Sequence, residues 1–113
     1  MIERVEGDAA LRDAYCLVVD GEGWHRGVIG ICATRLVERY GKPTLVISRD
    51  GAEAHGSGRS IAGFHLLQAL EHETCARYFT RFGGHSHAVG FGLPSENIAP
   101  LRSALDTDRK SVV

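Results

Sequence analysis

The fold is decided by residues 14–48, which read AYCLVVDGEGWHRGVIGICATRLVERYGKPTLVIS. Residues 14–20 and residues 44–48 are short apolar runs rich in β-branched side chains, which is typical of buried strands. Gly41 and Pro43 are helix stop signals before the second run. Between the runs, apolar side chains recur at the spacings of three and four that an amphipathic helix requires: Val28, Ile29, Cys32, Leu36 and Tyr40. Strand, helix and strand within 35 residues predict a right-handed βαβ unit with parallel strands, and hence an α/β protein.

The remaining elements extend this unit into a larger sheet. Residues 49–60 (RDGAEAHGSGRS) contain an Asp-Gly turn, a polar stretch compatible with a third strand, and a glycine-rich loop. Residues 88–93 are compatible with a strand, and residues 95–105 predict a helix with Ser95 as its N-cap. Residues 64–77 predict a helix with three apolar side chains on one side: Phe64, Leu67 and Leu70. The whole predicts a mixed sheet of about five strands with helices packed on it.

Length and composition favour one folded domain. The chain has 113 residues, of which 43% are hydrophobic and 24% charged, as in an ordinary globular protein. We expect one domain over residues 1–113, with its core in residues 14–105 and a frayed tail over residues 106–113. No apolar run approaches the roughly 20 residues that cross a bilayer, and the N-terminus lacks the pattern of a signal peptide, so we expect a cytoplasmic protein.

The cysteine spacing argues against disulfide or CxxC chemistry, and the charge distribution permits a polyanionic ligand. Three widely spaced cysteines suggest neither a disulfide framework nor a CxxC motif: Cys16, Cys32 and Cys75. The formal net charge is -1, but residues 23–49 carry five Arg and Lys side chains against Glu38 alone. This basic middle permits a polyanionic ligand without requiring one, because a modest charge excess also suits a solvated face.

Three polar, glycine-containing segments are candidates for holding phosphate. The first is GWHRGVIG, residues 23–30, which follows a predicted strand and opens a predicted helix. A helix start presents unpaired backbone N–H groups, Gly27 lets a ligand approach them, and His25 and Arg26 add donors. The alternative is an ordinary capped turn in which Trp24 fills the core.

The second segment is HGSGRS, residues 55–60. Its glycines free the backbone, its serine hydroxyls can donate hydrogen bonds, and Arg59 offers a planar fork suited to bidentate contact with phosphate. A simple hairpin turn is the alternative. The spacing and the terminal Lys-Ser/Thr of a P-loop are absent.

The third segment is TRFGGHSHAVGFGLP, residues 80–94. Gly83 and Gly84 are candidates for positive φ angles, and His85 can donate to an anion or stack on a base. His87 points the other way if the chain is extended, and no acidic or cysteine partner at a recognised spacing completes a metal site with the two histidines. Each signal is weak alone, but the three segments together predict convergence at one end of the sheet, where α/β proteins usually bind ligands.

In this order, GWHRGVIGICATRLVERYGKPTLVIS, GSGRS and FGGHSHAVGF resemble the DHH-associated C-terminal domain of RecJ-like phosphoesterases, over roughly residues 14–105. The resemblance implies a mixed-sheet α/β domain that packs across a cleft from a separate catalytic DHH domain. Family members hydrolyse phosphodiester bonds in single-stranded DNA, short oligoribonucleotides or cyclic dinucleotides, with manganese or magnesium held by the DHH domain.

The resemblance assigns substrate contacts to matching positions of this sequence. These are His25, then Ser57, Gly58, Arg59 and Ser60, then Gly83, Gly84 and His85, with Ala88 and Gly90 closing the turn. Many relatives have two alanines before the final glycine, where this chain has Ala88 and Val89. The chain lacks an Asp-His-His motif, an Asp-x-Asp motif and a two-metal cluster, so we assign it no catalytic residue, metal ligand or cofactor and do not expect it to hydrolyse substrate by itself.

The leading interpretation is a domain that binds the phosphates of single-stranded DNA or an oligonucleotide and positions them for a DHH domain, in the same longer chain or in trans. Such binding should tolerate sequence and weaken with salt. Trp24 and Phe91 are the nearest aromatic side chains for stacking, so no extended stacking platform is predicted. Two alternatives remain: a free-standing module for a nucleotide or cyclic dinucleotide, and a docking domain for a catalytic partner.

Overall fold

The computed structural model describes residues 16–63, 65–71, 73–85 and 87–112. Along the chain these form β1 (Leu17–Glu22), α3 (Arg26–Tyr40), β2 (Thr44–Asp50), β3 (Glu53–Arg59), α4 (Leu66–Glu71), α5 (Glu73–Ala76), β4 (Arg81–Gly84), β5 (Ala88–Pro94), the 3-10 turn η1 (Ser95–Asn97) and α6 (Ile98–Val112).

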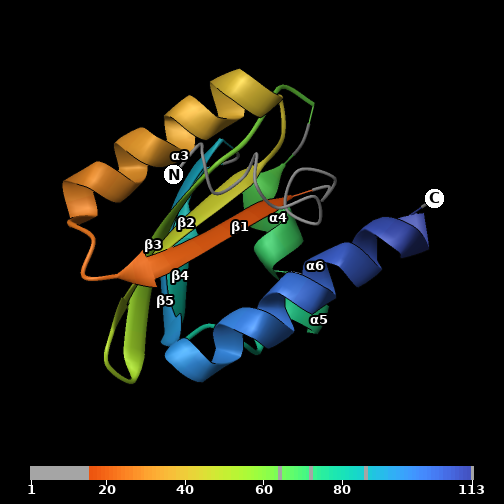
Figure 1. Cartoon of the computed structure of the whole chain (residues 1–113). Coiled ribbons are helices and arrows are strands. Elements are labelled where there is room, and N and C mark those ends of the chain that lie inside the picture. The colour runs from red at the N-terminus through yellow and green to blue at the C-terminus, as the bar shows by residue number, and fades with distance from the viewer. Residues whose placement is uncertain (1–15, 64, 72, 86, 113) are drawn as a thin grey trace.

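The strands form one mixed five-stranded sheet in the order β1-β2-β3-β5-β4. Strands β1 and β2 are parallel and are joined through α3, whereas β3, β5 and β4 pair antiparallel with their neighbours. Helix α3 lies on one face of the sheet, and α4, α5 and α6 lie on the other (Figure 1). The predicted fold class and the βαβ unit are therefore confirmed.

Helix α3 closes the smaller of two apolar clusters. Its residues Ile29, Ala33 and Leu36 pack against three side chains of the parallel strands: Leu17, Val19 and Val46. Gly41 ends the helix in the left-handed region with φ of 63°, and its N–H donates to the carbonyl oxygen of Val37, as the stop signal predicted. The predicted apolar face was wrong in one position, because Val28 is 48% exposed.

The opposite face of the sheet holds the larger cluster. Strand side chains that include Leu45, Val89 and Phe91 meet apolar side chains of the helices: Leu66, Leu70, Cys75, Ile98, Leu101 and Leu105. Phe91 is only 3% exposed and makes an edge contact with Phe79, so it is a core residue and cannot stack on a base.

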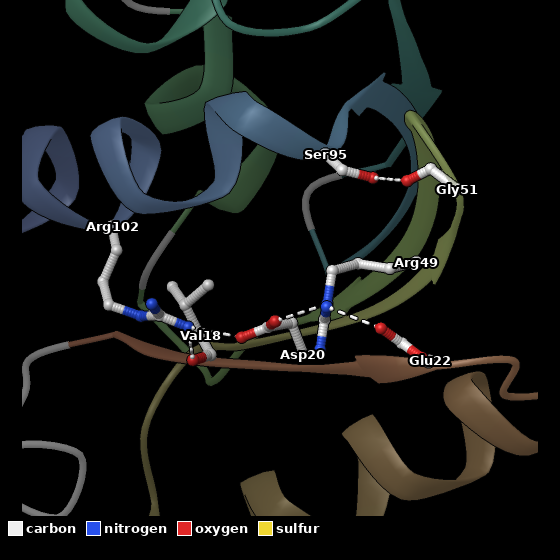
Figure 2. A network of polar contacts seen from close by, with 7 residues as sticks. All are labelled: Val18, Asp20, Glu22, Arg49, Gly51, Ser95 and Arg102. Carbon is white, nitrogen blue, oxygen red and sulfur yellow. Dashed lines mark hydrogen bonds and ion pairs between the residues drawn. The ribbon is translucent and has the colours of Figure 1, made fainter.

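A polar network fastens α6 to the edge of this face (Figure 2). Arg102 donates to the carbonyl oxygen of Val18 at 2.8 Å and pairs with Asp20 at 2.9 Å. Asp20 also pairs with Arg49 at 2.9 Å, and Arg49 reaches Glu22 at 3.3 Å. These contacts join the helix to β1 and β2 on the side away from α3.

Several predicted boundaries need correction. The segment 64–77 forms two short helices, α4 and α5, with Phe64 outside the described residues. Ser95 is not a helix N-cap: it begins η1, and its hydroxyl donates to the carbonyl oxygen of Gly51 at 2.8 Å. Helix α6 extends from Ile98 to Val112, and the predicted fraying from Asp106 stays a prediction.

The glycine-rich segment at 55–60 is also different from its prediction. Residues 55–59 lie within β3, which is paired on both sides, and only Ser60 follows the strand. The segment looked like a loop because its alternate residues are glycines rather than apolar side chains. Their role in the strand follows from what packs against them.

Candidate nucleic-acid interface

Strand β3 presents different chemistry to the two faces of the sheet. Gly56 and Gly58 face the larger cluster, because a Cβ atom at Gly56 would lie 2.4 Å from Cζ of Phe91, and one at Gly58 would lie 2.7 Å from Cδ2 of Leu45. The intervening residues face the α3 side: His55, Ser57 and Arg59. The core therefore requires Gly58, which was predicted as a substrate contact, to lack a side chain.

Strands β5 and β4 continue the α3 side as an open floor. Gly90 lies opposite Ser57 of β3, and Gly83 lies opposite Gly90. Both glycines are exposed, and no described atom comes within 4 Å of a Cβ atom placed on either. A bare strip of backbone therefore extends outward from β3.

Helix α3 forms the wall beside this floor. A Cβ atom at Gly30 would lie 3.2 Å from Nη2 of Arg59 and 3.8 Å from Oγ of Ser57, so Gly30 allows the helix to lie close over both side chains. Nη1 of Arg59 donates to the carbonyl oxygen of Gly58 at 2.8 Å, which holds the guanidinium at the wall. The groove between wall and floor has a volume of about 460 Å³ and includes Ser57 and Gly90 in its lining.

The second and third predicted segments meet where β3 ends. Arg59 lies opposite Ala88 in the sheet, and the N–H of Ser60 donates to the carbonyl oxygen of His87 at 2.9 Å. The N–H of His85 donates to the carbonyl oxygen of Ala88 at 2.8 Å, and the side chain of His85 is exposed. Arg59, Ser60 and His85 are thus connected in the sheet through Ala88 and His87.

The two glycines of the third segment have separate roles. Gly84 has φ of +143°, and a Cβ atom there would lie 2.3 Å from the carbonyl oxygen of Ala88, so the backbone requires glycine. Gly83 has no positive φ, which corrects the prediction for that residue. Its lack of a side chain leaves open space on the groove floor.

The first segment lies toward the other end of β3. His25 is the N-cap of α3, and its Nδ1 accepts a hydrogen bond from the N–H of Gly27 at 3.1 Å, so this backbone donor is already occupied. Arg26 lies near Glu53 at the start of β3, whereas Arg59 ends that strand. The predicted convergence at one end is therefore wrong for His25. The partly buried Trp24 packs on the smaller cluster, as expected for the alternative of a capped turn.

Two groove residues were missed by reasoning from the sequence: His55 and Arg81. His55 lies on β3 beside Arg26 of α3 and Arg81 of β4. Burial lowers the pKa of His55 from its usual 6.5; Arg26 and Arg81 lower it further, against the opposing effect of Asp50. Reading residues 55–59 as an alternating strand would have placed His55 on the same face as Ser57 and Arg59.

Neither a metal cluster nor a membrane-spanning helix is found in the described residues. No three or more His, Cys, Asp or Glu side chains in these ranges gather closely enough to hold a metal ion. Among the described helices, none is long and apolar enough to cross a membrane.

Comparison with known proteins identifies the family. The model of the DHHA1 domain matches residues 13–108, so the chain belongs to the DHHA1 domain family. It is 40% identical over 107 residues to the single-stranded-DNA-specific exonuclease RecJ of Bacillus subtilis, and 43% identical over 82 residues to that of Dickeya dadantii. The matches cover 93% and 70% of this chain but only 13% and 14% of those relatives.

Solved structures support the same fold. RecJ from Thermus thermophilus in complex with Mg²⁺ superposes with a TM-score of 0.79 at 23% identity, over 98% of this chain and 17% of that one. An exonuclease RecJ bound to manganese gives a TM-score of 0.75 at 25% identity, over 85% of this chain and 23% of that one. The C-Ala domain of Aquifex aeolicus alanyl-tRNA synthetase shares the fold, with a TM-score of 0.63 at 15% identity over 83% of this chain and 93% of that domain.

Proposed function

We propose that this chain is the substrate-holding domain of a RecJ-like exonuclease. It binds the sugar-phosphate backbone of single-stranded DNA or a short oligonucleotide in the groove beside α3. A DHH catalytic domain, in the same longer chain or in trans, carries out hydrolysis. The relatives named as single-stranded-DNA-specific exonucleases support this assignment, since each matches this chain over a small part of its own length.

The observation that carries the proposal is the open glycine floor next to a fixed arginine. Gly83 and Gly90 leave the backbone bare where no described side chain needs the space, and Arg59 lies against Gly30 of α3, two residues along β3 from Ser57 of the groove lining. A phosphodiester chain can approach such a floor closely and accept hydrogen bonds from the guanidinium. Phosphate contacts position a strand without reading its bases, so binding should tolerate sequence.

Metal ions enter the proposal only through the proposed DHH catalytic domain. Two of the solved RecJ structures contain Mg²⁺ or manganese. Such an ion in a DHH domain would activate water and neutralise charge on the scissile phosphate. The task of Arg59, His85 and the glycine floor is to hold the neighbouring backbone in place for that step.

The test is a fluorescence-anisotropy titration of 5′-phosphorylated single-stranded DNA into the protein at low and moderate salt. Arg59→Ala and His85→Ala should each weaken binding with little loss of stability, whereas Arg35→Ala, an exposed charge elsewhere on α3, should not. Unchanged affinity in both the Arg59 and the His85 variant would remove the proposed site. An affinity for mononucleotides that does not grow with oligonucleotide length would instead favour a nucleotide-binding module.

A further inference from the structure

A second basic cluster lines the groove near the start of β3, whereas Arg59 ends that strand. It combines three side chains from three elements: Arg26 in the first turn of α3, His55 on β3 and Arg81 at the start of β4. All three line the main groove, and all three also line the hollow that continues it past β3.

The sheet register brings two of these side chains toward one another. His55 and Arg81 lie opposite the same residue, Gly92, on its two sides. A Cβ atom at Gly92 would lie 3.2 Å from Nε and 3.4 Å from Cζ of Arg81, so the arginine side chain lies across this glycine toward β3. Glycine at position 92 therefore allows Arg81 to approach the groove rather than the edge of the sheet.

The two arginines of the cluster are unpaired within the described residues, although Asp50 and Glu53 line the adjoining hollow. Neither Arg26 nor Arg81 forms an ion pair with any described side chain, and Nε2 of His55 is buried without a hydrogen-bond partner among them. Both arginines lower the pKa of His55, which shows that their fields overlap at the imidazole. An anion here would satisfy a buried polar atom and relieve repulsion between like charges.

The cluster is too far from Arg59 to share one phosphate with it. His55 and Arg59 are four residues apart on β3, which corresponds to about 13 Å along a strand. The floor between them is the bare backbone of Gly83 and Gly90. A single extended backbone lying on this floor would bring different phosphates to the two ends.

Acidic side chains lie immediately beyond the cluster. Asp50 and Glu53, which flank the turn between β2 and β3, line the outer hollow together with Arg26, His55 and Arg81. Carboxylates repel phosphate, so we expect a polyanion bound in the groove not to extend over these two side chains.

We propose that Arg26, His55 and Arg81 form a second phosphate subsite, which binds a different phosphate of the same strand from the one held by Arg59. The inference rests on the proposed function, because it assumes that the groove holds a nucleic-acid backbone. It adds a minimum length to the substrate: a strand must reach across the floor to engage both subsites, whereas a mononucleotide engages one.

The experiment compares a 5′-phosphorylated mononucleotide with oligothymidylates of increasing length, using the wild type, Arg81→Gln, His55→Gln and Arg59→Gln. Arg35→Gln serves as the charge-matched control, and thermal unfolding of each variant checks the fold. Arg81→Gln should weaken binding of the longest oligomer by about tenfold or more, the scale of one lost charge-assisted contact. It should also lower the slope of log affinity against log salt by about 0.7 per lost phosphate contact, and leave mononucleotide binding unchanged.

The outcomes separate the two proposals. If Arg59→Gln weakens binding of every ligand while Arg81→Gln and His55→Gln match the Arg35→Gln control, the second subsite does not exist and the proposed function stands. If Arg81→Gln weakens mononucleotide binding as much as oligomer binding, the two clusters form one site and the length requirement is wrong. If the wild type binds no oligonucleotide, both proposals fail.

Discussion

The two faces of the sheet both use glycine, but for opposite reasons. On the face covered by α4, α5 and α6, Gly56 and Gly58 lack side chains because Phe91, Leu45 and other core side chains already occupy the space. On the face beside α3, Gly83 and Gly90 lack side chains although no described atom lies within 4 Å of where a Cβ atom would be.

This difference separates glycines that the fold requires from glycines that it does not. Packing density explains the first pair, since protein interiors leave few voids larger than a water molecule. Neither packing nor a positive φ explains Gly83 and Gly90. Backbone left bare without a structural cause is the feature expected of a surface that a ligand approaches closely.

The largest loss of stability is expected when a side chain is added to a glycine on the core side of the sheet. Gly56→Val should destabilise the domain by about 3 kcal/mol, because the new Cβ atom would overlap Phe91 and also meet the carbonyl oxygen of Val46 at 3.0 Å. Urea unfolding monitored by far-UV circular dichroism measures this. A fully stable variant would mean that the core can rearrange around position 56.

A smaller loss is expected where the backbone itself demands glycine. Gly84→Ala should cost about 2 kcal/mol, because φ of +143° strains any L-residue and its Cβ atom would meet the carbonyl oxygen of Ala88. The same unfolding measurement applies, with Gly83→Ala as the neighbouring control. Equal stabilities for the two variants would contradict the assigned conformation of Gly84.

The polar network on the core side should contribute less to the free energy of unfolding than the two glycines do. Asp20→Ala removes the ion pairs with Arg49 and Arg102 and should lower stability by about 1 kcal/mol, since all three side chains are partly exposed (Figure 2). Glu22→Ala, which removes only the 3.3 Å contact of a highly exposed carboxylate, is the control and should change little. Oligonucleotide binding on the opposite face should be unaffected by either change. A loss of binding that accompanies the loss of stability would show that the two faces of the sheet are coupled.

The pH dependence of stability tests the electrostatics of the α3 side. The pKa of His55 is lowered in the folded protein, so the unfolded chain binds more protons when both forms are compared near pH 6.5. His55 therefore contributes fully to the free energy of unfolding above pH 6.5, and this contribution is lost as the pH falls through the pKa of His55 in the folded protein. His55→Gln should flatten this part of the curve in urea unfolding across the acidic range, with the other histidines common to both proteins. Parallel curves would mean that His55 is not desolvated as described.

The smallest effect on stability is expected on the groove floor. Gly90→Val should leave the free energy of unfolding within about 0.5 kcal/mol, because the side chain enters open space at a position without strain. The same change should sharply weaken binding of single-stranded DNA, since the branched side chain occupies the floor. If both stability and binding are unchanged, the groove does not receive the ligand.

Several parts of the fold were predictable because their signals are local. The apolar runs on either side of α3 and the helical spacing of Ile29 and Leu36 gave the βαβ unit, and Gly41 marked the helix end. Arg59 and His85 are predicted as phosphate contacts from the sequence, because a planar cation and a histidine beside glycines are recognisable in short motifs, and this assignment stays a prediction. By contrast, the sequence predicts a loop at the polar segment with glycines at 56 and 58, because no apolar periodicity marks it as a strand.

The sequence by itself thus determined the class of fold, the helix boundaries near Gly41 and the residue types suited to phosphate. The tertiary structure alone decided that His25 caps α3 and that Gly58 serves the core. It also decided that Arg81 lies across Gly92 toward His55. The physical reason is that period, caps and stop signals act between residues close in sequence. Strand register and the filling of space depend on partners that meet only when the sheet is assembled.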